Sequence, residues 1–346
     1  MNKENLIDAF SVLGKCMVGL ATRESEKCTN LLTTSEFEDF QELILKQKQK
    51  NGWFTEESVR QAMLSLGNQL STEQLNTWQL PYSFTDKPKK VAIIMAGNIP
   101  LVGFHDFLCV LLSGNSAVCK LSSDDQSLLP ALAEILMKIA PAFGDRIVFT
   151  QGRLGEIEAV IATGSDNSKL YFEQYFGKYP HIFRSNRTSL AVLSGNETDD
   201  DLQQLGFDIF NYFGLGCRNV SHLLLPRGFS LNRIFENITS FSEAINHHKY
   251  ANNYDYNRAI FLMNSVPFLD NNIILLRENT ELVSPLAVVH YQFYDDVKEV
   301  ENFIEQQGEK IQAIVGQKYI PFGKAQSPAL SDYADNVDTM QFLNSL

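Results

Sequence analysis

The feature that most constrains the fold of this chain is an alternation of strand-like and helix-like segments that begins near residue 90. The apolar run VAIIMAGNIPL is followed by the helix-like VGFHDFLCVLLSG, the β-rich SAVCKLS, the helix-like LLPALAEILMKIA and the strand-like RIVFTQG. This order requires a mostly parallel sheet with right-handed crossovers, which is an α/β fold. Ligands of open parallel sheets bind at the carboxyl ends of the strands, so we expect functional residues there.

Other segments flank this alternation. A length of 346 residues is too great for one ordinary core. The first 80 residues are rich in helix formers and carry helix start signals, a capping box formed by Ser35 and Glu38 and an N-cap at Thr55. We predict four parts: a helical N-terminal segment over residues 1–80, the parallel α/β domain over 81–195, a second α/β domain over 196–325, and a C-terminal tail over 326–346.

The charge of the chain weighs against a nucleic-acid partner. Lys and Arg total 29 against 41 Asp and Glu, which gives a formal net charge of -12, and no basic run breaks that balance. The five cysteines are widely spaced and include no CxxC pair, so we expect reduced thiols. The six histidines show no metal-ligand spacing, and His247 with His248 is expected to be a solvated pair, so no metal site is predicted.

No segment has the character of a signal peptide or a membrane span. Asp8 and Lys15 interrupt the apolar stretch near the N-terminus. No run of roughly 20 consecutive apolar residues occurs, which is the length that a membrane-spanning helix needs. We expect a soluble, cytoplasmic protein without a membrane partner.

Several widespread catalytic motifs are absent from the sequence. No GxGxxG follows the first strand, and GxxxxGK[ST], HExxH and GxSxG do not occur. P-loop, zinc protease and serine hydrolase functions therefore lose support.

Cys217 is a candidate nucleophile. It lies in the loop GLGCRN, between an amphipathic helix and the strand-like VSHLLLP. Two glycines beside a cysteine permit the close backbone approach that a nucleophile with N–H donors for an oxyanion needs. The alternative is a buried structural cysteine. The adjacent Arg218 would either lower the thiol pKa or form a surface ion pair.

Two turns at strand ends offer binding groups. Asn98, in GNIP, could donate an amide hydrogen bond to a developing oxyanion, although Gly, Asn and Pro are also what ordinary turns use. The turn Thr163-Gly164-Ser165 lies at a strand-to-helix junction, where backbone N–H groups could bind a pyrophosphate. An ordinary helix start is the alternative there.

Six fragments between about residue 90 and 325 are MAGNIPL, GNSAVCKLSS, ATGSD, YFGLGCRN, ELVSPLAVV and IPFGKA. Taken in order, they resemble the aldehyde dehydrogenase superfamily, and within it the LuxC-like acyl-CoA reductase branch. The resemblance implies a Rossmann-type cofactor domain followed by an α/β catalytic domain. It assigns the oxyanion donor to Asn98 and the nucleophile to Cys217. The cofactor contacts that it assigns are Lys120 at the adenosine ribose, Gly164 and Ser165 at the pyrophosphate, and Glu281 at the nicotinamide ribose.

The activity that this resemblance implies is NAD(P)H-dependent reduction of an acyl thioester to an aldehyde through an acyl group on Cys217. The donor would be an acyl-CoA or an acyl-carrier thioester, and a homodimer is expected. Relatives that oxidise aldehydes carry a water-activating glutamate, whereas the matching stretch here, HIFRSN at residues 181–186, has no carboxylate. Two alternatives are an aldehyde dehydrogenase or acyl-phosphate reductase using the same cysteine, and a non-catalytic scaffold.

NADP(H) is favoured over NAD(H) as the cofactor. Relatives that select NAD carry a glutamate three residues beyond the ribose-binding lysine, and this position holds Ser123 here. A neutral hydroxyl tolerates a 2′-phosphate, and Lys120 could pair with it. NAD(H) is the alternative.

Overall fold

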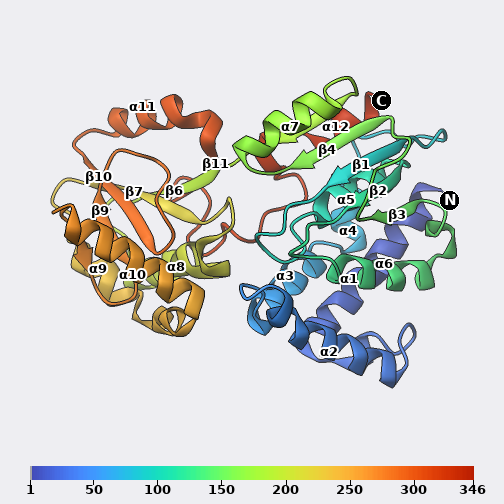
Figure 1. Ribbon diagram of the computed structural model, residues 1–346, viewed down its shortest axis with the longest axis horizontal. Helices are drawn as coiled ribbons and strands as arrows, with labels where there is room; N and C mark the ends of the chain where they lie inside the picture. Colours follow the sequence, from blue (N-terminus) through green and yellow to red (C-terminus); the bar gives the residue numbers. More distant parts are fainter. Residues whose placement is uncertain (1) are drawn as a thin grey trace. The chain divides into compact units, whose positions relative to one another are not determined.

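The computed structural model describes residues 2–346 and divides them into two compact units (Figure 1). The first contains the chain up to Ser185 together with Ala329–Leu346, and the second contains Asn186–Pro328. Two differences from the predicted boundaries concern the residues on either side of the second unit. Residues 186–195 belong to the second unit because their strand pairs with that unit's sheet. The greater part of the expected C-terminal tail is an integral part of the first unit.

The first unit contains the predicted parallel sheet. Its strand order is β3-β2-β1-β4-β5, and all four pairings are parallel. The order reverses between β1 and β4, so the carboxyl ends of these strands form the switch point at which open α/β sheets bind ligands. The strands are β1 (Lys90–Ile94), β2 (Ser116–Lys120), β3 (Ile147–Thr150), β4 (Ala159–Thr163) and β5 (His181–Arg184).

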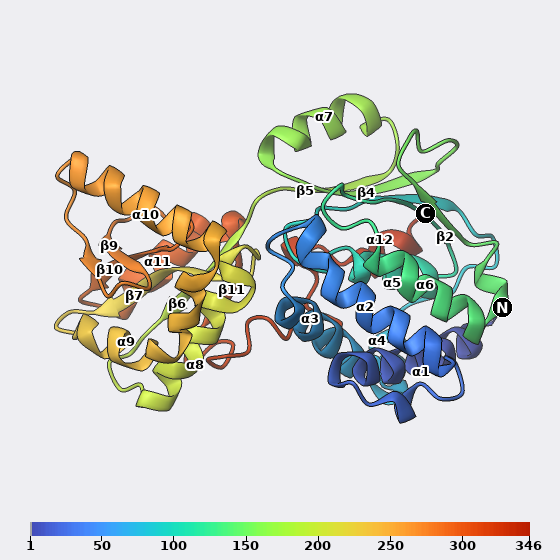
Figure 2. The same cartoon turned by 60° about the horizontal axis from the view of Figure 1, so that its bottom comes forward.

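Helices cover both faces of this sheet (Figures 1 and 2). One face packs on α5 (Phe104–Leu112) and α6 (Leu128–Ile139), which share a core with Ile93 and Ile161. The other face packs on α7 (Asp166–Phe176) through Phe172 and Phe176. No helix joins β3 to β4, so residues 151–158 form an irregular crossover.

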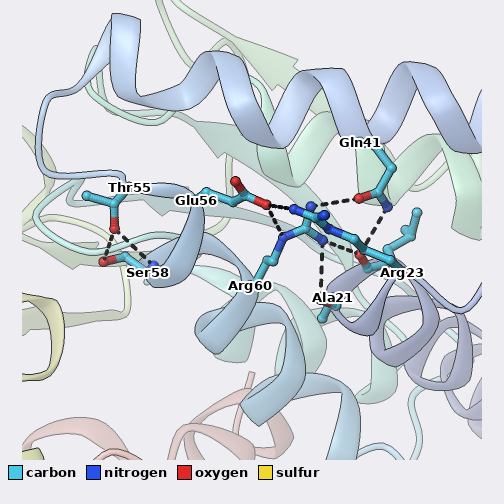
Figure 3. A network of polar contacts seen from close by, with 8 residues as sticks. Ala21, Arg23, Gln41, Thr55, Glu56, Ser58 and Arg60 are labelled. Carbon is cyan, nitrogen blue, oxygen red and sulfur yellow. Dashed lines mark hydrogen bonds and ion pairs between the residues drawn. The ribbon is translucent and has the colours of Figure 1, made fainter.

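The predicted helical N-terminal segment is present, but its core is continuous with that of the sheet. Arg60 ties three of its helices together (Figure 3): its guanidinium donates to the carbonyl oxygens of Leu20 at 2.8 Å and Ala21 at 3.2 Å, and to the side chains of Gln41 and Glu56 at 2.8 Å each. These bonds satisfy carbonyl groups that the end of a helix leaves unpaired. The helices are α1 (Lys3–Thr22), α2 (Thr34–Lys50), α3 (Glu56–Asn68) and α4 (Thr72–Gln79).

Two details of this segment bear on the sequence predictions. Thr55 is the N-cap of α3, as predicted. The capping box of α2 is formed by Thr33 and Glu36 rather than by Ser35 and Glu38. Both pairs have the required spacing, so the local pattern could not decide between them.

Helix α1 has the length and mean hydropathy of a membrane-spanning helix. However, 67% of that apolar stretch is buried inside the first unit. A core helix of a globular domain passes the same test, and the burial favours that interpretation.

The C-terminal segment returns to the first unit and ends in α12 (Thr339–Asn344). The hydroxyl of Tyr333 accepts a hydrogen bond from the indole of Trp78 at 2.8 Å, and Asp338 accepts one from Tyr82 at 2.7 Å. Leu330 and Met340 are buried in the same core. The segment therefore completes the packing of the N-terminal helices.

The second unit contains a six-stranded sheet in the order β11-β6-β7-β10-β9-β8, parallel except for the β8–β9 pair. Helix α11 covers one face, and α8, α9 and α10 lie on the other (Figures 1 and 2). The strands are β6 (Thr188–Val192), β7 (Val220–Pro226), β8 (Leu269–Asp270), β9 (Leu275–Glu278), β10 (Val288–Tyr294) and β11 (Ile311–Val315). The helices are α8 (Asp199–Phe210), α9 (Leu231–Asn237), α10 (His248–Met263) and α11 (Val297–Gln307).

Candidate active site

The turn that carries Asn98 follows β1 and packs on the loop that follows β2. A Cβ atom added at Gly97 would lie 2.5 Å from the Ser122 hydroxyl and 2.9 Å from the Asp124 Cβ, so only glycine allows this approach. Asn98, the next residue, is exposed at the carboxyl end of the sheet, and so is Ser123 in the facing loop. The fold therefore brings these two predicted residues onto adjacent loops.

A buried carboxylate holds this pair of loops. Asp125, in the loop after β2, accepts a hydrogen bond from the Leu101 N–H at 2.9 Å. Leu101 has a φ of 58°, a left-handed conformation that costs energy for a leucine and is maintained by this bond. Burial raises the pKa of Asp125 to about 6. Asp125 was given no role from sequence, although an acidic residue shortly after a strand end is a usable signal.

Three more predicted cofactor contacts, Lys120, Gly164 and Ser165, lie along the same edge, while Glu281 belongs to the second unit. Lys120 ends β2, paired with Ile94 at the end of β1. Ser165 is the N-cap of α7, where its hydroxyl accepts the Ser168 N–H at 3.2 Å. A Cβ at Gly164 would lie 2.7 Å from the Ser168 Cβ, so this turn also requires glycine. The positive end of the α7 dipole therefore lies at the carboxyl edge of the sheet, where it favours an anion.

The loop that carries Cys217 follows α8 in the second unit. Tyr212, Phe213 and Gly214 have φ values of 52°, 58° and 81°, so three successive residues are left-handed and reverse the chain. The ring of Phe213 packs on His247 with 4.3 Å between centroids. His247 is half-buried by this contact, so the prediction of a solvated pair is wrong for His247, while His248 is exposed.

Cys217 is the one exposed cysteine among residues 2–346. The other four are buried, and burial raises the pKa of Cys109 and of Cys119. A thiol with a raised pKa forms little thiolate and reacts slowly. The interpretation of Cys217 as a buried structural cysteine is therefore wrong.

A buried asparagine fixes the Cys217 loop. The Asn219 Oδ1 accepts the Gly216 N–H at 2.8 Å. Its Nδ2 donates to the carbonyl oxygens of Asp208 at 3.0 Å, Ile209 at 3.2 Å and Asn211 at 2.9 Å. One side chain thus joins the loop to the unpaired carbonyl end of α8. Asn219 lies within the motif GLGCRN but was given no role from sequence.

The segment IPFGKA is held by the same end of α8. The carboxylate of Asp208, which is fully buried, accepts the Gly323 N–H at 2.7 Å and the Ala325 N–H at 2.9 Å. Burial raises the pKa of Asp208 to about 6. Asp208 and Asn219 together position two segments that were singled out from sequence.

Glu281 lies on an exposed loop after β9, and two buried histidines hold its backbone. The carbonyl oxygen of Glu281 accepts the Nδ1–H of His222 at 3.0 Å and that of His290 at 2.9 Å. These residues are register partners on β7 and β10. Burial lowers the pKa of both rings, that of His222 to about 4, so both are neutral at pH 7. Neither histidine was given this role from sequence.

The stretch that replaces the water-activating glutamate contains a buried cation. Arg184, at the end of β5, forms a buried ion pair with Asp106 and donates to the Thr339 hydroxyl at 2.8 Å. His181 in the same stretch is exposed and stacks on Phe183 with 4.0 Å between centroids. Arg184 is therefore a structural residue that joins β5 to α5 and α12.

A family model described as acyl-CoA reductase (LuxC) matches residues 5–212. The chain belongs to the acyl-CoA reductase (LuxC) family. It is therefore an oxidoreductase that acts on aldehyde or oxo groups. The match ends before Cys217, so the assignment of that residue depends on the loop itself. A search of curated proteins found no match.

Solved structures with the same fold are aldehyde dehydrogenases. The indole-3-acetaldehyde dehydrogenase of P. syringae, solved with NAD+ and IAA, has a TM-score of 0.63 at 13% sequence identity. The match covers 91% of this chain and 72% of the dehydrogenase chain. An aldehyde dehydrogenase of Mycobacterium tuberculosis complexed with NAD+ has a TM-score of 0.58 at 14% identity, with 88% and 72% covered. At such identities the likeness shows the fold, and the predicted aldehyde-dehydrogenase-like fold is confirmed.

The predicted site residues of this oxidoreductase fall into two groups, one in each unit. Asn98, Lys120, Ser123, Gly164 and Ser165 lie along one edge of the first sheet. Cys217 and Glu281 belong to the second unit. A cavity of about 60 Å³ in this unit is lined by Gly214 and Asn219, from the segment of Cys217, and by residues 284–289, which follow Glu281. Among residues 2–346 no group of three or more His, Cys, Asp or Glu side chains could hold a metal ion.

Proposed function

We propose that this family member reduces an acyl thioester, an acyl-CoA or an acyl-carrier thioester, to an aldehyde with NADPH through an acyl group on Cys217. The observation that carries the proposal is the Cys217 loop: its thiol is exposed, and Asn219 fixes the loop by four hydrogen bonds. An accessible thiol on a fixed loop suits a nucleophile that must hold an acyl group in one orientation.

The first unit fits a nicotinamide adenine dinucleotide. A pocket of about 790 Å³, within the usual range for ligand sites, begins at Lys120 and runs along α7. By the family resemblance Lys120 would contact the adenosine ribose, the Gly164–Ser165 turn the pyrophosphate, and Glu281 the nicotinamide ribose. When bound, the nicotinamide supplies a hydride to the acyl carbon. Ser123 is exposed and neutral beside this edge, which supports NADP(H), with NAD(H) as the alternative.

The residues of the chain carry the remaining steps. The Cys217 thiolate attacks the thioester carbon, and the S–C bond to the donor breaks as its thiolate leaves. The tetrahedral oxyanions of acylation and reduction would be stabilised by the Cys217 backbone N–H and by the Asn98 amide, which the resemblance assigns. After reduction, the thiohemiacetal collapses, so that the aldehyde leaves and the thiolate of Cys217 is restored.

The two alternatives have less support. An aldehyde dehydrogenase needs a base to activate water, and at the matching position HIFRSN offers only Arg184, in a buried ion pair, and His181. A scaffold without activity would have no need for an exposed thiol on a loop with two strained residues, Tyr212 and Phe213.

The test of the proposal is a cofactor-oxidation assay with a panel of acyl-CoA and acyl-carrier thioesters of different chain lengths. We expect acyl-dependent loss of NADPH absorbance and formation of the matching aldehyde. NADPH oxidation without any thioester dependence, or none with the whole panel, would contradict the proposal.

A further inference from the structure

The pocket along α7 has an aromatic part. Four aromatic side chains of the helix line it, and α7 has no buried residue. Tyr171 and Tyr175 are 62% and 64% exposed, although side chains of this size normally bury most of their surface. Exposed aromatic side chains beside a pocket can stack on the face of a purine base.

All ionisable lining groups of this pocket other than tyrosine are cationic. They are Lys120, Arg153 and Lys178, and no Asp or Glu contributes to the lining. Within residues 2–346 none of the three is paired with a carboxylate, whereas Lys90, at the start of β1, pairs with Glu156 at 4.0 Å. The chain as a whole has a formal net charge of -12. A purely cationic pocket on an acidic protein is suited to an anionic ligand.

Arg153 lies close to Lys120 because of a turn after β3. Thr150, the last residue of β3, is the register partner of Lys120. The Thr150 hydroxyl accepts the Gly152 N–H at 3.1 Å and donates to the Arg153 carbonyl oxygen at 3.5 Å. Neighbouring strands lie about 4.8 Å apart, so this turn keeps Arg153 beside the strand end that carries Lys120.

Lys178 belongs to the opposite end of the pocket. It follows α7, and its Nζ lies 5.0 Å from the centroid of the Tyr179 ring. An 11-residue helix is about 16 Å long, so Lys178 is far from the turn at the start of α7. The cations nearest a ribose held by Lys120 are therefore Lys120 itself and Arg153.

We propose that Arg153, together with Lys120, binds the ribose phosphate of a phosphorylated adenine nucleotide and so determines the nucleotide specificity of this pocket. Such a phosphate is present at the 2′ position in NADPH and at the 3′ position in coenzyme A, and it is absent from NADH. A guanidinium binds phosphate oxygens through two parallel hydrogen bonds. NADH has no ribose phosphate, so in its complex the guanidinium would not form these bonds. This inference rests on the proposed function, because it requires a nucleotide in this pocket.

The test compares the binding of adenosine 2′,5′-bisphosphate, adenosine 3′,5′-bisphosphate and AMP by calorimetry. We expect one bisphosphate to bind the wild-type protein at least about tenfold more tightly than AMP, which corresponds to about 1.4 kcal/mol. Arg153→Ala should remove this preference and leave the AMP affinity within about twofold, while Arg153→Lys should keep part of it. Preference for the 2′ isomer identifies NADPH as the source of the phosphate, and preference for the 3′ isomer identifies coenzyme A.

Lys169→Ala is the matched control, since Lys169 lies on α7 but does not line the pocket. It should leave all three affinities unchanged. An effect equal to that of Arg153→Ala would show that the loss of any nearby positive charge weakens binding, and it would overturn the inference. Equal binding of AMP and both bisphosphates, or a preference that survives in Arg153→Ala, would overturn it while leaving the proposed function standing. Absence of binding of any nucleotide would overturn both.

Discussion

Cys217 differs from the other cysteines of the chain in the surroundings of its sulfur. Its side chain is exposed, while Cys28 is buried in the core of the N-terminal helices. Cys217→Ser should abolish acyl-enzyme formation without changing the fold, because a serine hydroxyl without an adjacent base is a far weaker nucleophile than a thiolate. Intact-mass measurement after incubation with acyl-CoA checks this. Cys28→Ala is the control that keeps the adduct, and an adduct that persists in Cys217→Ser would refute the assignment.

Asn98 is exposed at the end of β1 on a turn that Gly97 and Asp125 fix. Asn98→Ala should lower kcat by about 10²- to 10³-fold, equivalent to about 2.7–4 kcal/mol, because an oxyanion donor acts mainly where negative charge develops. The Kd for the cofactor should change little. Steady-state kinetics and cofactor titration separate the two effects. A change confined to cofactor binding would make Asn98 part of a binding turn instead.

Asn219 positions the nucleophile loop without needing to touch the substrate. Asn219→Asp keeps the acceptor for the Gly216 N–H but sets a carboxylate oxygen against three carbonyl oxygens. We expect the acylation rate to fall at least about tenfold and the free energy of unfolding to fall by about 1–3 kcal/mol, the cost of leaving buried polar groups unpaired. The alkylation rate of Cys217 with iodoacetamide should change in parallel. Unchanged acylation and alkylation rates would mean that the loop keeps its shape without this side chain.

Among the elements, the paired strands β7 and β10 carry the two histidines that hold Glu281. Burial lowers the pKa of His222 to about 4 from an unfolded value near 6.5, so between these values the unfolded chain binds more protons. The stabilising contribution of neutral His222 is complete above about pH 6.5 and is lost as the pH falls towards 4, to a limit of about 3 kcal/mol. Asp208, with a pKa raised to about 6, changes stability in the opposite sense over part of this range.

For this reason the test compares His222→Asn with the wild type rather than using one profile alone. Asparagine offers an N–H in place of Nδ1–H but does not titrate in this range. As the pH falls from 6.5 to 4, the wild type should therefore lose more free energy of unfolding than the variant does. Denaturant unfolding at several pH values measures it. Parallel pH profiles for the two proteins would show that His222 is not the titrating group.

At this scale the sequence predicts the alternating strands and helices of the first unit well, because each has a clear apolar period and turn residues at its ends. It could not assign β6, which follows β5 after three residues yet pairs in the other sheet. Such pairing depends on contacts distant in sequence. The return of the C-terminal segment to the first unit also depends on contacts distant in sequence. The spacing of the apolar residues Met340 and Leu343 did indicate a helix with one buried face there.

The sequence predicted those residues of the candidate site whose own side chains can react or bind a ligand. Cys217, Asn98 and Lys120 attract notice by residue type and by their place at turns or strand ends. Asp125, Asn219 and the histidine pair act through bonds to backbone groups, whose positions depend on the path of loops. No local pattern specifies those paths, so the structure was needed to find these residues.

For the whole molecule, the proposed reductase activity requires that an acyl group on Cys217 is passed to a thiol far more readily than to water. The cation in HIFRSN is the Arg184 guanidinium in its buried pair with Asp106, and no carboxylate in that stretch can take a proton from water. A thiol acceptor needs less base assistance than water does. The reaction run in reverse therefore separates a reductase of this kind from an oxidising dehydrogenase.

The most direct measurement supplies an aldehyde and NADP+ without a thiol and follows both NADPH and the mass of the protein. We predict a single burst of NADPH that is stoichiometric with active sites, an acyl group on Cys217, and no further turnover until coenzyme A is added. Steady release of free acid without added thiol would contradict the account, because it would show that another residue, such as His181 or Glu173, activates water.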